Sequence, residues 1–155
     1  MEEHAFSLIR PAEKAGTFRF SPGRLEKHTV ENLGDIESPF LRIELKKLPL
    51  GYGDNSFRSP KSFDDVHSGV RHEFDRGRLE IDRIVASAGA TTLPHANGDT
   101  LLVALADTGV QPANGGSTRL LKIGEVFCPD PQRDYRISAQ DSNGVGHLLR
   151  VLIKP

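Results

Sequence analysis

The sequence lacks several features that would assign it to a function class. It has one cysteine, Cys128, so no disulfide can form within the chain. No apolar run approaches the roughly 20 residues of a membrane-spanning helix, and the acidic N-terminus lacks the apolar core of a signal peptide. The net charge is −1 with both signs interleaved, so no basic stripe indicates nucleic-acid binding. These absences predict a cytoplasmic protein that binds neither membranes nor nucleic acid.

Recognisable catalytic motifs are also missing. There is no Gly-x-Ser-x-Gly elbow, which argues against the common serine-hydrolase arrangement. Asn114-Gly115-Gly116 lacks the Gly-Lys-Ser/Thr ending of a phosphate-binding loop and is typical of a hairpin turn. Cys128 lies in a strand pattern with no histidine at a suggestive spacing, so we expect a buried, unreactive thiol.

What the sequence does contain is strand-like alternation. In residues 40–46, Leu41, Ile43 and Leu45 alternate with charged residues, as in a half-buried strand. The 15 glycines and 10 prolines are spread along the chain between short segments of this kind. The expected strands are residues 5–10, 17–20, 28–31, 40–46, 70–74, 79–86, 100–106, 118–122, 125–128, 135–138 and 148–153. Many short strands separated by turn residues predict an all-β antiparallel sandwich or barrel.

An internal repeat relates the two ends of the chain. Residues 41–46 match residues 149–154 at a spacing of 108 positions, and residues 16–20 match residues 124–128 at the same spacing. Such repeats indicate repeated structural units, and chance likeness between amphipathic strands is the alternative. The expected parts are a partial repeat or strand extension at 1–48, a linker at 49–69 and a complete unit at 70–155.

The most specific pattern lies between Gly89 and Gly109. Gly89 is followed by His95 and Asn97, then by a strand-like run that closes at Gly109. This spacing resembles the first motif of the cupins, small RmlC-like β-barrel proteins, in which a glycine precedes His-x-His, a glutamate and a second glycine. The resemblance implies a double-stranded β-helix of the jelly-roll type for residues 70–155.

The resemblance also indicates where a metal would bind. Cupin metal sites use two histidines and a glutamate from the first motif and one histidine from the second, ligands that suit Fe, Mn, Zn or Ni. In the complete unit these positions become His95, Asn97, Leu101 or Leu102, and Tyr135. Only His95 is a strong ligand, so we expect no tight transition-metal site there.

The N-terminal segment carries a looser likeness to the second cupin motif. Pro22 and Gly23 precede His28, and Asn32 follows His28 after three residues. His28 would be the second-motif histidine of a partial unit and is, with His95, a weak metal candidate. The alternative for His28 is an ordinary strand residue.

The cupin resemblance implies a ligand pocket inside one end of the barrel. The residues expected to line it are His95, Asn97, Tyr135, Leu102, Val103 and Leu120. Two functions follow as expectations. The first is a small-molecule-binding or structural protein with a metal-free barrel site and no cofactor. The second is a metal-dependent small-molecule enzyme of the dioxygenase or isomerase type, with a divalent transition metal.

A partial unit cannot close a barrel by itself, and its unpaired strand edges would favour association. We therefore expect residues 5–47 to join the sheet of the complete unit, in the same chain or across the two-fold axis of a homodimer. Leu41, Ile43 and Leu45 would then be buried at that junction.

Overall fold

The structure is a computed structural model that describes residues 67–155 almost completely. The residues it describes are 17–18, 35, 41, 43, 67–87, 89–141 and 144–155. Most of the strands expected before residue 67, most of the linker expected at 49–69, and His28 lie outside the described residues. No helix among the described residues is long and apolar enough to cross a membrane.

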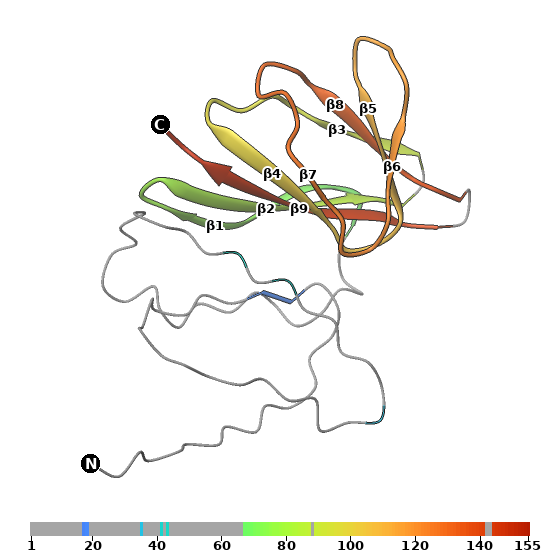
Figure 1. The fold of residues 1–155 in the computed structure, drawn as a ribbon, viewed down its shortest axis with the longest axis horizontal. Coiled ribbons are helices and arrows are strands. Elements are labelled where there is room, and N and C mark those ends of the chain that lie inside the picture. Colours follow the sequence, from blue (N-terminus) through green and yellow to red (C-terminus); the bar gives the residue numbers. More distant parts are fainter. Residues whose placement is uncertain are drawn as a thin grey trace.

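The described domain consists of nine β-strands in two antiparallel sheets (Figure 1). The strands are β1 (Gly69–Arg76), β2 (Leu79–Ala86), β3 (Ala90–Leu93), β4 (Asp99–Ala104), β5 (Thr108–Pro112), β6 (Arg119–Leu121), β7 (Val126–Phe127), β8 (Tyr135–Ala139) and β9 (Gly146–Ile153). The larger sheet has the order β1-β2-β9-β4-β7, and the smaller has the order β3-β8-β5-β6. The expected all-β antiparallel sandwich is confirmed.

The main core lies between the two sheets. Its buried side chains come from both of them, and Leu102, Leu121, Ile137 and Leu148 are all fully buried. Where one strand contributes two core residues they are two positions apart, as Leu102 and Ala104 are in β4, which is the two-residue period of a strand. The interior of the sandwich is therefore filled by aliphatic side chains from opposite sheets.

The outer face of the larger sheet carries a second apolar cluster. The buried members, among them Phe74, Ile81, Val103 and Leu149, all belong to β1, β2, β4 and β9. Phe18, from the N-terminal part of the chain, packs against this cluster. The strands β2 and β9 are consequently buried on both faces, which explains their nearly continuous apolar sequences.

The sequence missed β3 and β5. β5 contains Gly109, which was expected to close the preceding strand-like run, and ends at Pro112. In the structure a Cβ on Gly109 would lie 2.8 Å from the hydroxyl of Ser138 on the neighbouring strand, so this glycine permits close strand packing instead of a turn. The turn comes later, at Gly115 and Gly116, which have φ values of 99° and 127°.

Two other expectations need correction. Cys128 follows the end of β7 and is exposed, not buried. Leu41 and Ile43 are 50% and 41% exposed, so the single chain does not bury them at a strand junction. Leu45 lies outside the described residues.

Candidate functional site

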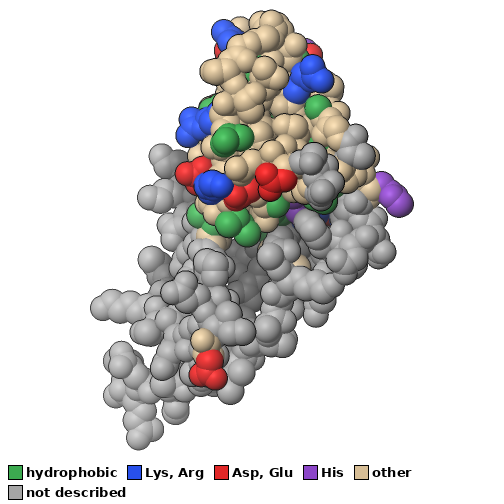
Figure 2. Space-filling model, turned by 90° about the vertical axis from the view of Figure 1, so that its right-hand side faces the viewer, with side chains coloured by type: hydrophobic (Ala, Val, Ile, Leu, Met, Phe, Trp, Pro, Cys, Tyr) green, Lys and Arg blue, Asp and Glu red, His purple; other side chains and the backbone are tan. Residues whose placement is uncertain are grey.

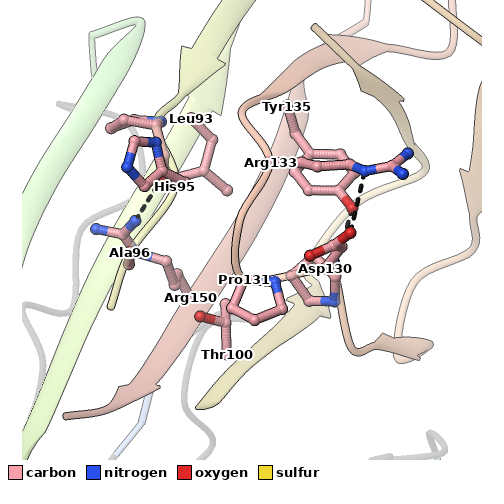
Figure 3. Close-up of a pocket in the computed structure, with 11 residues that line it drawn as sticks. Leu93, His95, Ala96, Thr100, Asp130, Pro131, Arg133, Tyr135 and Arg150 are labelled. Carbon is pink, nitrogen blue, oxygen red and sulfur yellow. Dashed lines mark hydrogen bonds and ion pairs between the residues drawn. The ribbon is translucent and has the colours of Figure 1, made fainter. Parts of the chain in front are cut away.

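A small pocket lies at the mouth of the sandwich (Figure 3). The loop after β3 contributes His95, β4 contributes Thr100, the loop before β8 contributes Arg133, and Tyr135 and Arg150 come from β8 and β9. Its volume is about 10 Å³, which is room for about one water molecule. The mouth is therefore nearly closed by the protein's own side chains.

The structure brings together two of the six expected pocket residues. His95 and Tyr135 both line the pocket. Asn97 is exposed and Leu102 is buried in the main core. Val103 belongs to the cluster on the opposite face of the larger sheet, because neighbouring residues of a strand point to opposite faces.

The sixth expected residue, Leu120, is 53% exposed and does not line the pocket. The glutamate position of the first motif was assigned to Leu101 or Leu102. Leu101 packs against the outer cluster, and the pocket-lining residue of this strand is Thr100.

His95 is held at the rim by Asp134. Its backbone N–H donates to Asp134 Oδ1 at 2.8 Å, and its ring Nδ1 lies 2.8 Å from the same oxygen. These contacts lower the pKa of Asp134, with the backbone hydrogen bond as the largest cause. The side chains of His95 and Asp134 are 65% and 47% exposed. This pair therefore lies at the surface, where it joins the loop after β3 to the loop before β8.

Tyr135 is buried and is held at both ends. Its hydroxyl accepts a hydrogen bond of 2.9 Å from the backbone N–H of Asp130. Its ring meets Phe127 edge-on, with centroids 6.2 Å apart, a favourable arrangement for two aromatic rings. The Arg119 guanidinium covers the Phe127 ring at 4.7 Å. Tyr135 therefore ties the loop before β8 to the core.

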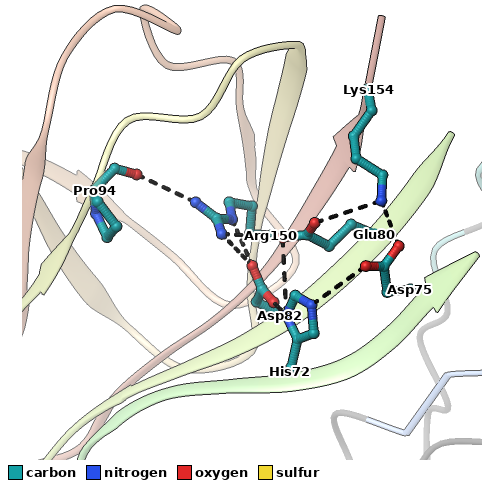
Figure 4. Close-up of polar contacts among 7 residues, drawn as sticks. All are labelled: His72, Asp75, Glu80, Asp82, Pro94, Arg150 and Lys154. Carbon is teal, nitrogen blue, oxygen red and sulfur yellow. Dashed lines mark hydrogen bonds and ion pairs between the residues drawn. The ribbon is translucent and has the colours of Figure 1, made fainter.

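Arg150 lies at the centre of a charge network beneath the pocket (Figure 4). Its Nε donates to Asp82 Oδ2 at 2.7 Å, and its Nη1 donates to the Pro94 carbonyl at 3.2 Å. Asp82 is fully buried, and Arg150 is only 7% exposed. Glu80 lies 3.4 Å from Arg150 Nη2. Buried charges persist when they are paired and hydrogen-bonded in this way.

His72 extends the network to the edge of the sheet. Its Nδ1 forms a short hydrogen bond with Asp82 Oδ1, and its Nε2 lies 3.8 Å from Asp75. The Asp82 hydrogen bond is the main cause that raises the pKa of His72. Lys154 pairs with Asp75 and lies 3.8 Å from Glu80.

The side chains of His72, Glu80 and Asp82 offer three potential metal ligands within 4.8 Å of one another. They fit a metal poorly, because Arg150 and Lys154 already supply positive charge to the two carboxylates. A divalent cation would have to displace these side chains or lie beside them against charge repulsion. The cluster is accordingly an ion-pair network.

A separate polar cluster lies on the outer face of the larger sheet. Glu73 binds Arg83 through both carboxylate oxygens and also accepts from Arg71. Burial raises the Glu73 pKa, but the two arginines more than offset this and lower it. Arg83 Nη1 lies 2.8 Å from Nε2 of the fully buried His147. Burial, followed by the two nearby arginines, lowers the His147 pKa to about 3.

These networks were not predicted, although the sequence contains a signal for them. Asp82, Arg83 and Arg150 interrupt otherwise apolar strands. Asp82 pairs directly with His72 on one side and with Arg150 on the other. A charged residue inside an apolar strand requires a partner on the neighbouring strand, so the two interrupted strands could have been paired on that basis.

The chain matches known proteins in the comparison of structures but not in the comparisons of sequences. No protein-family model matches the chain, and no curated protein matches it.

Several solved cupin structures are similar in fold. A cupin domain from Bordetella pertussis Tohama I has a TM-score of 0.47 and 14% identity, and the match covers 58% of this chain and 98% of that one. A cupin-2 domain-containing protein from Shewanella frigidimarina NCIMB 400 has a TM-score of 0.44 and 11% identity, with coverages of 58% and 84%. A cupin-2 conserved barrel domain protein from Salinispora arenicola CNS-205 has a TM-score of 0.44 and 12% identity, with coverages of 55% and 74%.

Proposed function

We propose that this chain is a cupin-like binding or structural module that works without a catalytic metal. The observation that carries the proposal is the pairing of the polar groups at the mouth with one another. Arg150 is paired with Asp82, and His95 with Asp134. Among the described residues that line the mouth, these pairings leave few charged groups to act on a substrate.

Within that proposal, the packing favours a structural role over the binding of a small molecule. Drug-sized ligands occupy pockets of roughly 300–1,000 Å³, whereas this pocket holds about 10 Å³. A ligand would have to displace the loop around His95 or the loop that Tyr135 holds through Asp130. A structural module would act through its surface, and association into a homodimer is part of the proposal.

The second candidate is a metal-dependent enzyme of the dioxygenase or isomerase type. The observation in its favour is the His72, Glu80 and Asp82 group. Such an enzyme would use a divalent transition metal held by imidazole and carboxylate ligands. The same residues are engaged with Arg150 and Lys154, which is why we rank this candidate second.

Metal analysis separates the two candidates. The chain is purified without a chelator and without an affinity tag, and its Fe, Mn, Zn and Ni contents are measured by mass spectrometry. The proposal predicts far less than one metal ion per chain, and the same result for His72→Gln. One equivalent of a single metal in the parent protein, lost in His72→Gln but kept in His67→Gln, would overturn the proposal in favour of the enzyme.

A further inference from the structure

The larger sheet is covered on both faces, although the smaller sheet packs on only one of them. The smaller sheet meets it through the main core. On the opposite, outer face, Leu79 and Ile81 of β2 and Leu149 and Val151 of β9 are at most 8% exposed. Antiparallel sheets with one face in water carry exposed, mostly polar side chains on that face. Side chains from outside the nine strands therefore cover this face.

The polar cluster on the same outer face is buried as well. Arg83 is 3% exposed and His147 is fully buried, and the side chain of Glu73 is 1% exposed. Charged side chains at an open sheet face would keep their contact with water, because losing it is costly even for paired groups. The cover consequently extends over the polar cluster as well as the apolar one.

The structure places one aromatic side chain from the N-terminal part of the chain in this cover. Phe18 packs against the outer apolar cluster and is itself half-buried. In Figure 1, residues 17–18, in blue, lie on the side of the larger sheet that faces away from the smaller sheet. The other partly buried members of the cluster, Leu101 and Leu105, belong to β4 or directly follow it. An aromatic ring brings a large apolar contact area, which suits Phe18 to the role of an anchor.

The outer face differs from other surfaces of the domain in the continuity of its apolar side chains. Figure 2 shows one side of the molecule, on which the hydrophobic side chains of the described residues stand in small groups among basic and acidic ones. Scattered exposed apolar residues of that kind are common on soluble proteins and require no partner. The outer cluster instead draws buried side chains from four strands, β1, β2, β4 and β9.

We propose that the outer face of the larger sheet is a docking surface for the N-terminal part of the same chain, with Phe18 as its anchor. The four strands of the outer cluster are adjacent in the sheet, so crossing them takes about 15 Å, which roughly five extended residues span. The connection from Phe18 to β1, which begins at Gly69, is far longer. Docking within one chain then costs only loop-closure entropy, which rises slowly with loop length.

Nuclear magnetic resonance on the full chain tests the contact directly. We expect nuclear Overhauser effects between the Phe18 ring and methyl groups of the outer apolar cluster, whose members include Val103, Leu149 and Val151. In an equal mixture of ¹³C-labelled and unlabelled chains, effects filtered to run between labelled and unlabelled chains should be absent. No effect in the fully labelled protein, or an effect between chains in the mixture, would overturn the proposal.

A variant tests whether Phe18 holds the cover in place. A soluble paramagnetic agent enhances the relaxation of methyl groups that water can reach. Phe18→Ala loses about half of the free energy of burying a phenylalanine, so the enhancement at Val103 and Leu149 should rise roughly threefold or more. The methyl groups of Leu102 and Leu148, which are fully buried in the main core on the other side of the sheet, should be unaffected.

The matched control is Leu41→Ala, which removes an apolar side chain that also comes from the N-terminal part but is 50% exposed. Its enhancement pattern should equal that of the parent protein. Equal enhancement at Val103 and Leu149 in Phe18→Ala and the parent would overturn the proposal. The nuclear Overhauser measurement uses the unsubstituted chain, so it decides the question even if Phe18→Ala does not fold.

Discussion

Replacing His147 should reduce the loss of folding stability that this protein undergoes as the pH falls. The ring is fully buried, and its Nε2 lies within hydrogen-bonding distance of Arg83. A guanidinium can only donate, so the contact requires a neutral imidazole that accepts at Nε2. Protonation would place a buried positive charge beside Arg83, which explains why the pKa of His147 falls to about 3.

The magnitude follows from the two pKa values. The unfolded chain binds a proton on this histidine near pH 6.5, whereas the folded chain does so only near pH 3. The folded state is therefore at its full stability above 6.5 and loses stability as the pH falls from 6.5 toward 3. Between pH 8 and pH 5, this one group should lower the free energy of unfolding by about 2 kcal/mol.

The assay is urea unfolding at a series of pH values, followed by circular dichroism. His147→Gln replaces the ring by an amide that can still accept from Arg83 without titrating. The variant should be less stable at pH 8 but should lose about 2 kcal/mol less than the parent on going to pH 5. His67→Gln, at an exposed position, is the control and should show the parent slope. Identical slopes in the parent and His147→Gln would refute the reasoning.

Two paired comparisons test the packing. Leu121→Ala, at a fully buried position, should cost about 2–5 kcal/mol, whereas Leu120→Ala, at an adjacent exposed position, should change stability by less than about 0.5 kcal/mol. Similar losses in chemical denaturation would contradict the placement of β6. Gly98→Ala should destabilise more than Gly77→Ala, because a Cβ at Gly98 would lie 2.3 Å from the Ile153 carbonyl oxygen, whereas none of the described atoms lies within 4 Å of one at Gly77. Both glycines have positive φ, so equal melting temperatures for the two variants would show that this contact relaxes freely.

Short strand-like segments separated by turn residues were sufficient to predict the fold class. The segment 79–86 coincides with β2, and 148–153 falls within β9. Both strands are long and strongly apolar, so burial dominates their sequence pattern. β5 was missed because it is short and its glycine serves close packing, which local sequence does not distinguish from a turn.

The candidate site was harder to predict. Of the residues that the cupin resemblance placed in a ligand pocket, His95 and Tyr135 lie together at the mouth of the sandwich. Val103 was misplaced because it is adjacent to Leu102, and neighbouring residues of a strand point to opposite faces of the sheet. The network of Asp82 and Arg150 depends on which strands are neighbours, and the cupin motifs gave no information about those two residues.

The central claim is that the carboxylates of Glu80 and Asp82, beneath the mouth, are paired with the protein's own cations. Titration of the chain with Mn²⁺, followed by nuclear magnetic resonance, tests it most directly, because the paramagnetic ion broadens the signals of nearby nuclei. The account predicts weak broadening, spread over exposed acidic residues, that does not saturate at one equivalent. Selective broadening of His72, Glu80 and Asp82 that saturates at one equivalent and is absent in His72→Gln would contradict it.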